Sequence, residues 1–121
     1  MTALDEAKAL AVEAINFLAT PLELTSRGLI LDRMAALRLP AIYQWPDSAE
    51  EGGLIGYGPR FTQVYRQRVR QVAKILRGAK PADVPVEQPS NFELVINLKT
   101  AKTINHEVSA GLVLRTDKVI E

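Results

Sequence analysis

Hydrophobic and polar positions alternate along the first 45 residues in a way that predicts helices and short strands in turn. Leu4–Val12 has apolar residues at helical spacing. Leu29–Leu37 shows the same spacing, and the preceding Thr25 and Ser26 can cap a helix. Two short apolar runs, Ala14–Ala19 and Leu39–Tyr43, follow these helices and predict buried strands. This order of elements favours a parallel sheet with helices packed on it.

The second half of the chain predicts one long helix between two further strands. Gly53–Gly58 is the third predicted strand, and Pro59 suits the first turn of a helix that runs from Arg60 to about Leu76. Phe92–Leu98 alternates apolar and polar residues, which predicts a fourth strand with one face better buried. The other predicted segments are a polar loop at Trp45–Gly52, a Pro-rich extended crossover at Ala79–Asn91, a short helix at Lys99–Ile104 and a last helix at Leu112–Ile120.

Composition adds that these elements form one α/β domain over residues 1–121. The hydrophobic fraction is 47% and the charged fraction 24%, the balance of an ordinary globular protein. The formal net charge of +1 gives no reason to expect nucleic acid or a membrane surface as a partner. No stretch approaches the roughly 20 apolar residues of a membrane span, so no membrane insertion is expected. The acidic start of the chain does not resemble a secretory signal, so the chain as written is expected in the cytoplasm.

The residues that usually carry catalysis are sparse, and we expect no enzyme, metal or cofactor. The chain has no cysteine, which excludes thiolate metal sites and cysteine nucleophiles, and its single histidine, His106, is expected in a solvated turn. Asp47, Glu50 and Glu51 are three carboxylates in one predicted loop, and a solvated loop is the favoured interpretation over acid–base chemistry. None of the serines lies in a Gly-x-Ser-x-Gly turn.

Two further patterns leave a structural and a binding interpretation open. The long helix carries a cationic stripe, which can bind phosphates but is more simply a solvated helix face. The glycine-rich segment Gly52–Pro59 either is a tight strand-to-helix turn or presents a helix start and the ring of Tyr57 to a ligand carboxylate. The stripe consists of Arg66, Arg70, Lys74 and Arg77.

Four motifs in order give the sequence a resemblance to a known family. They are Leu39–Tyr43, Gly52–Pro59, Ile75–Pro89 and Phe92–Ala101. Together they resemble the ABC transporter substrate-binding family associated with uptake of aromatic amino acids and similar solutes. The similarity runs from about Ala14 to the end of the chain and corresponds to the C-terminal third of such a protein.

The resemblance implies part of a type I periplasmic-binding-protein fold, in which two α/β lobes clamp a ligand between them. About four short, mainly parallel strands with flanking helices are then expected. The loop at Thr20 and Pro21 and the turn at Tyr57 and Gly58 would face the cleft and contact an amino-acid-like solute. Full-length relatives are expected in the periplasm, and a transporter permease is an expected partner only of a full-length form.

The function expected from these observations is that of a truncated or fragmentary solute-binding protein without catalysis. The alternative is a self-associating structural or interaction module that has lost ligand binding. Half of a two-lobed fold leaves strand edges and apolar helix faces uncovered, so a homo-oligomer is expected.

Overall fold

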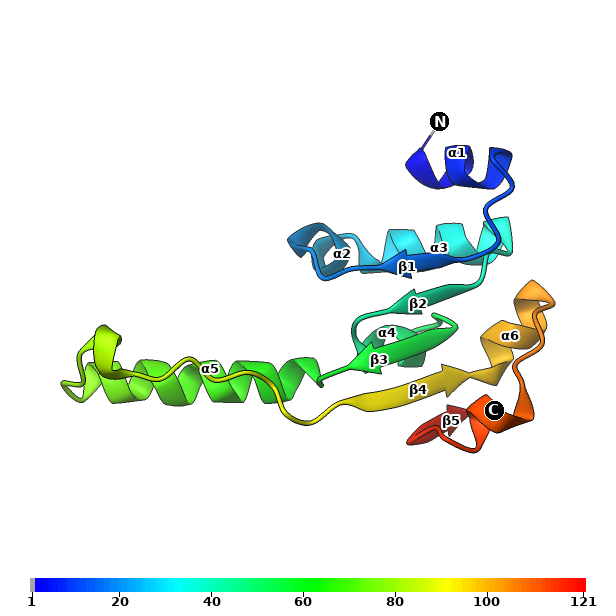
Figure 1. Cartoon of the computed structure of the whole chain (residues 1–121). Coiled ribbons are helices and arrows are strands. Elements are labelled where there is room, and N and C mark those ends of the chain that lie inside the picture. The colour runs from blue at the N-terminus through cyan, green and yellow to red at the C-terminus, as the bar shows by residue number, and fades with distance from the viewer. Residues whose placement is uncertain (1) are drawn as a thin grey trace.

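The computed structural model describes residues 2–121 as a mixed α/β fold with one helix that extends away from the sheet (Figure 1). The helices and strands are α1 (Ala3–Ala9), β1 (Ile15–Phe17), α2 (Pro21–Thr25), α3 (Arg27–Leu37), β2 (Ala41–Tyr43), α4 (Pro46–Glu50), β3 (Ile55–Gly58), α5 (Phe61–Leu76), the single-turn η1 (Pro81–Asp83), β4 (Glu93–Asn97), α6 (Leu98–Ile104), α7 (Ala110–Val113) and β5 (Lys118–Ile120).

The sheet has five strands in the order β1-β2-β3-β4-β5, one more than the predicted number. The first three strands are parallel, β4 runs antiparallel to β3, and β5 is parallel to β4. The mainly parallel α/β fold expected from the sequence is thus confirmed. The reversal at β4 follows from the chain path, since α5 and residues 79–91 carry the chain away from the sheet and back to the end it left (Figure 1).

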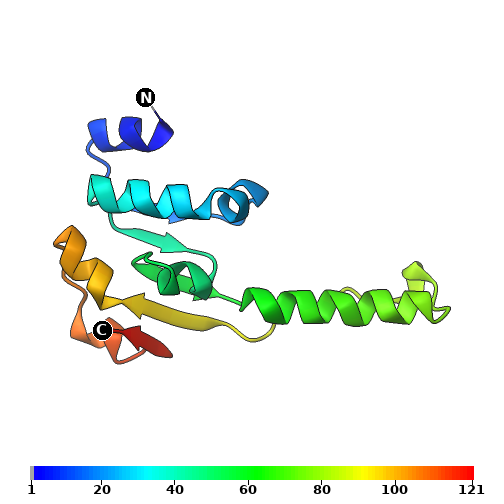
Figure 2. The same ribbon diagram turned by 180° about the vertical axis from the view of Figure 1, so that it is seen from behind.

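Helices α3, α4 and α6 cover one face of the sheet, the face turned to the viewer in Figure 2. The larger apolar cluster joins Leu31 and Met34 of α3 to Ala41 and Tyr43 of β2. A second cluster joins Leu54 to Ala101 and Ile104 of α6, which seats the C-terminal half on the same sheet.

Buried polar contacts lock the end of β4 to the region of α4. Asn97 is 5% exposed; it accepts the Thr100 N–H as the N-cap of α6 and donates its Nδ2 to the carbonyl of Ala49 at 2.9 Å. Thr100 donates its hydroxyl to the carbonyl of Gly52 at 2.9 Å. A side-chain cap and two long-range bonds therefore fix the turn from strand to helix.

Two of the predicted segments were wrong. Trp45–Gly52 is not a solvated loop, because Pro46 begins helix α4 and Ser48 and Ala49 are completely buried. Leu112–Ile120 is not a helix: α7 ends at Val113 and the β-branched pair Val119 and Ile120 joins β4 as the edge strand β5. The Asp117 carboxylate accepts the Leu94 N–H at 2.7 Å and anchors that strand.

The long predicted helix is confirmed, but its apolar face is not buried. Helix α5 runs for 16 residues and ends before Gly78. The φ of Gly78 is 105°, a left-handed backbone conformation that glycine adopts readily. No residue of α5 is buried. Residues 79–91, called the strap below, run back along one side of α5 (Figure 1). The helix and the strap together form an arm that leaves the sheet at the carboxyl end of β3.

Candidate functional site

The carboxyl ends of β1, β2 and β3 meet at one edge of the sheet, and the arm starts at this edge. Register places Phe17 beside Tyr43 and Tyr43 beside Gly56, so the residues that follow all three strands emerge together. Ligands of open α/β sheets bind outside this edge. We call it the carboxyl edge.

All seven aromatic residues of the chain lie at this edge or on the first turns of α5, and each contacts another aromatic ring. The rings of Phe17 and Tyr43 are stacked, with their centroids 5.0 Å apart. The rings of Trp45 and Phe61 meet edge to face, with their centroids 5.2 Å apart. Tyr43 and Trp45 are buried, whereas Tyr57 and Phe92 are about half exposed and present flat apolar surface near the strand ends. The remaining pairs are Tyr57 with Phe92 and Phe61 with Tyr65.

A pocket of about 380 Å³ lies on this edge and is called the edge pocket. Tyr57 is 53% exposed and contributes a ring and a hydroxyl to its wall. Asn16 and Gln44 add two side-chain amides, which can donate and accept hydrogen bonds. The full lining is Asn16, Phe17, Leu18, Ala19, Ile42, Tyr43, Gln44 and Tyr57.

A second pocket of about 330 Å³, the arm pocket, lies between the carboxyl edge and α5. It shares Ala19 and Gln44 with the edge pocket, so the two pockets adjoin. Arg68 and Glu87 line it with opposite charges. Its full lining is Ala19, Gln44, Trp45, Pro59, Val64, Gln67, Arg68, Gln71, Glu87 and Pro89.

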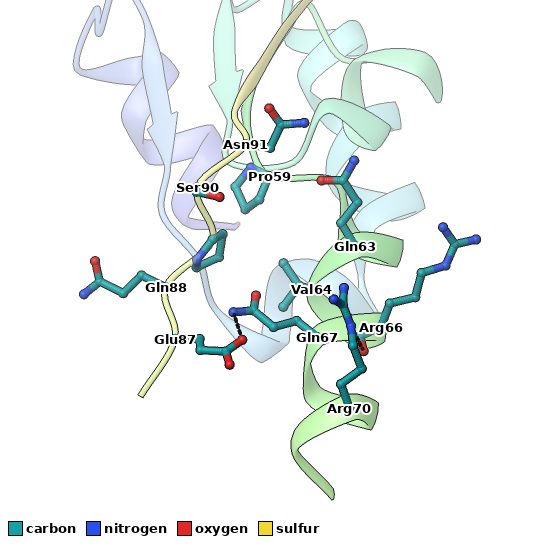
Figure 3. Close-up of a pocket in the computed structure, with 11 residues that line it drawn as sticks. Pro59, Gln63, Val64, Arg66, Gln67, Arg70, Glu87, Gln88, Ser90 and Asn91 are labelled. Atoms are coloured by element: carbon teal, nitrogen blue, oxygen red, sulfur yellow. Dashed lines mark hydrogen bonds between the residues drawn. The ribbon is translucent and has the colours of Figure 1, made fainter. Parts of the chain in front are cut away.

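Figure 3 shows a third pocket, of about 350 Å³, between α5 and the strap. Gln67 reaches across it and donates to Glu87 at 3.0 Å, which ties the helix to the strap. Arg66 and Arg70 line its helix side, and neither forms a salt bridge within the described residues. This pocket lies along the arm, whereas the edge pocket opens directly at the strand ends.

A network of charges fixes the point where the arm joins the sheet. Arg60 donates to Glu93 at 2.7 Å and lies 2.9 Å from Glu50. Lys118 also binds Glu50, at 2.8 Å. Hydrogen bonds from Lys118 and Arg60 hold the pKa of Glu50 below its usual range, although partial burial acts in the opposite direction. The outgoing and returning chains are thus bound to α4 and β5 at one place.

The four residues expected to contact a ligand have different positions. Tyr57 lines the edge pocket, while Gly58 is buried against the backbone of Gln44 and contributes no side chain. Thr20 caps α2 by accepting the Glu23 N–H at 3.2 Å, and Pro21 is the first residue of that helix. Neither lines the pocket, but their neighbour Ala19 does.

Sequence reasoning missed Asn16, Gln44 and Trp45. Each lies on or just after a short strand, so their position at the edge depended on the strand ends being located to within one residue. Gln44, the polar residue directly after the apolar run Leu39–Tyr43, was the available signal, whereas Asn16 lies inside its run and gave none.

The other candidate groups lie outside the edge pocket. His106 is exposed, in the turn after α6. Asp47, Glu50 and Glu51 lie on or next to α4, and two of them are engaged: Glu50 by Arg60 and Lys118, Glu51 by Arg27. Within residues 2–121 no group of three or more His, Cys, Asp or Glu residues is arranged to hold a metal ion. No helix in this part of the chain is long and apolar enough to cross a membrane.

The sequence matches a known protein family over most of its length. Residues 8–120 match the family described as ABC transporter substrate binding protein. The chain belongs to this family. The resemblance expected from the four sequence motifs is confirmed, and the match covers every strand of the sheet. A comparison with curated proteins gave no match.

Several solved structures share the fold of this chain. A conserved domain protein from Vibrio cholerae O1 biovar El Tor has a TM-score of 0.82 at 20% identity over 95% of this chain. An ABC domain from Streptococcus pneumoniae, solved in complex with L-Trp, has a TM-score of 0.79 at 21% identity over 96% of this chain. The ligand-free, open structure of a substrate-binding protein with adhesive properties from Clostridium difficile has a TM-score of 0.55 at 16% identity over 98% of this chain. The chain spans 40% of the length of each of these structures.

Proposed function

We propose that this protein is a non-catalytic solute-binding protein and that its ligand contacts the edge pocket. The observation that carries the proposal is the position of this pocket, at the carboxyl ends of β1 and β2 with Tyr57 of β3 on its wall. Membership of the ABC transporter substrate-binding family supports the same role.

The ligand class that fits this edge is a small amino-acid-like solute with a flat apolar part. The exposed rings of Tyr57 and Phe92 offer stacking surface, and the amides of Asn16 and Gln44 offer hydrogen bonds to a polar end. The Streptococcus pneumoniae domain of the same fold was solved with L-Trp, which supports this class. Ala19 lines both the edge pocket and the arm pocket. Thr20 and Pro21, which are expected to contact the ligand, follow it directly and lie at the rim of these pockets.

The other wall of the cleft would be supplied by a surface that packs on α5. One side of this helix carries an apolar stripe that is open to solvent: Tyr65 is 47% exposed, Val69 64%, Val72 54% and Leu76 82%. A stripe of this width at spacings of four, three and four is the pattern of a helix that packs on another element. We propose that a second α/β unit of the kind found in two-lobed binding proteins covers it.

Self-association is a second candidate role, which the same stripe favours. In a solution of this chain alone, the stripe can be covered by the apolar surface of a second copy. The edge strands β1 and β5 can also pair with another chain. A dimer by sedimentation velocity at micromolar concentration is expected, and the double variant Val69→Gln, Val72→Gln should be monomeric. A native chain that stays monomeric over this range would contradict the candidate.

Calorimetric titration with L-Trp and a panel of aromatic and branched amino acids tests the binding proposal. Tyr57→Ala should weaken binding at least about tenfold, because an aromatic contact of this size is removed. Leu114→Ala is the control: its side chain is exposed and lies outside the edge pocket, the arm pocket and the α5 stripe, so the affinity of this variant should equal that of the native chain. Absence of binding across the panel, or equal losses in both variants, would overturn the proposal.

The proposed function implies a cellular partner and a location for the protein. A solute-binding protein of this family would deliver its ligand to a transporter permease, and it would do so outside the cytoplasmic membrane. Fractionation of the producing cells, with detection of the native chain in each fraction, distinguishes this location from the cytoplasmic one expected from the N-terminal residues.

A further inference from the structure

Glu23 of α2 is a buried ionisable residue without a hydrogen-bond partner in the part of the chain that the structure describes. Its side chain is 2% exposed. Both carboxylate oxygens are buried, and neither has a hydrogen-bond partner within residues 2–121. A buried carboxylate is stable as an ion only when it is paired or hydrogen-bonded. The geometry therefore favours the neutral, protonated form.

The groups that face Glu23 do not neutralise its charge. Arg27 at the start of α3 is the cation that acts on it, but its guanidinium is bound to Glu51 through two bonds of 2.6 and 2.5 Å. Tyr43 of β2 is the other facing group and is itself buried. Burial raises the pKa of Glu23, and the charge of Arg27 offsets this only in part. Burial and the Glu23 charge both raise the pKa of Tyr43, so its hydroxyl stays neutral.

The position of Glu23 connects its protonation to the rim of the edge pocket. Its backbone N–H is the group that Thr20 caps, so Glu23 and Thr20 belong to one turn. Ala19, the residue before this turn, lines both the edge pocket and the arm pocket. A helix of five residues has few bonds of its own and holds its place mainly through what it buries. Glu23 is the buried residue of α2.

We propose that Glu23 is a proton-controlled latch: with its carboxyl group protonated, α2 stays seated against β2 and α3, and ionisation of that group releases α2 together with the pocket rim at residues 19–21. The seated state is then held at acidic pH and lost as the pH rises. An exposed glutamate ionises near pH 4.3, and the buried group keeps its proton to a higher pH. This inference concerns α2 itself and goes beyond the proposed function, because seating and release need no ligand.

Hydrogen exchange of residues 18–26 tests the latch on the whole chain between pH 5 and pH 8. Protection factors, corrected for the intrinsic pH dependence of exchange, should fall as the pH rises, by up to tenfold per pH unit over the titration. In Glu23→Gln, a neutral side chain of the same shape, they should stay constant. Constant protection in the native chain, or an equal fall in Glu23→Gln, would overturn the latch. Residues 27–37 of α3 serve as the internal reference.

A second variant tests the part assigned to Arg27. Glu51→Gln removes the carboxylate that occupies the Arg27 guanidinium, so Arg27 becomes available to the ionised Glu23. Protection of residues 18–26 should then persist to higher pH than in the native chain. An unchanged opening curve would contradict the role of the Arg27–Glu51 pair. The readout needs no ligand, so failure of the calorimetric test would leave it unaffected, and the reverse also holds.

Discussion

Arg60 donates from Nε to Oε2 of Glu93 at 2.7 Å, and this contact joins the chain that leaves the sheet to the chain that returns to it. Arg60 precedes α5, and Glu93 is the first residue of β4. Gly58 and Glu93 are paired across the antiparallel strands, so the bond closes the base of the arm beside the last ladder pair. The base of the arm is thereby fixed next to both the edge pocket and the arm pocket.

Loss of the Arg60 side chain should loosen this base. Arg60→Gln leaves the half-buried carboxylates of Glu50 and Glu93 without their shared cation, which should lower the free energy of unfolding by about 1–3 kcal/mol. Urea denaturation measures the change. Arg66→Gln is the control, since Arg66 lies on α5 without a salt bridge in the described chain, and it should stay within about 0.5 kcal/mol of the native protein. Equal losses in both variants would contradict the assigned role.

The close approach of β3 to the β2–α4 turn should make Gly58 intolerant of any side chain. A Cβ at Gly58 would collide with the backbone oxygen of Gln44, and one at Gly56 would lie 2.6 Å from the backbone oxygen of Trp45. Gly58→Ala should therefore lower the free energy of unfolding by about 3 kcal/mol or prevent folding. Gly28→Ala, where nothing lies within 4 Å, should instead stabilise α3 by about 0.5 kcal/mol. Thermal unfolding of the two variants compares them directly, and a Gly58→Ala chain as stable as the native one would refute the packing argument.

The N-terminal helix should lose its anchor in acid. Thr2 donates its backbone N–H and its hydroxyl to Asp5, and Arg33 of α3 binds the same carboxylate. The hydrogen bonds from Thr2, followed by that from Arg33, lower the pKa of Asp5 to about 2. A lowered pKa means that the stabilisation is complete above the unfolded value of about 3.9 and is lost as the pH falls through 2. Asp5→Asn should flatten the pH dependence of the urea midpoint in this range, whereas Glu6→Gln, an exposed neighbour, should keep the native curve.

The sequence predicted the elements whose signals are local. The helix α5 has an unbroken 3.6-residue period over 16 residues, a proline before it and Gly78 behind it. The strands β1 to β4 stand out as short apolar runs. Tyr57 lies inside the predicted strand Gly53–Gly58, and its contact with a ligand, which the family resemblance implied, stays a prediction.

The elements that were missed depend on distant contacts. Strand β5 exists because Val119 pairs with Ile96 and the Asp117 carboxylate binds the backbone of Leu94, neither of which is visible in the spacing of residues 112–120. Helix α4 did carry helix-start signals, Pro46 and an acid in the first turn, but its polar composition suggested a loop. The exposed face of α5 could not be predicted either, because an apolar stripe indicates packing and does not say what packs on it.

The opposite pH dependence is expected at Glu23, where the folded state raises the pKa instead of lowering it. The native chain should gain stability as the pH falls toward the unfolded glutamate value of about 4.3, since the folded state binds the proton more tightly. Glu23→Met removes a buried carboxylate that has no hydrogen-bond partner among residues 2–121, and it should raise the free energy of unfolding at pH 7 by about 1–3 kcal/mol. The gain should shrink as the pH approaches 4, because the native residue is then neutral as well. Urea titrations at pH 4, 5.5 and 7 measure this difference. A methionine variant less stable than the native protein at pH 7 would mean that Glu23 forms a favourable interaction as an ion, and it would remove the physical basis of the latch.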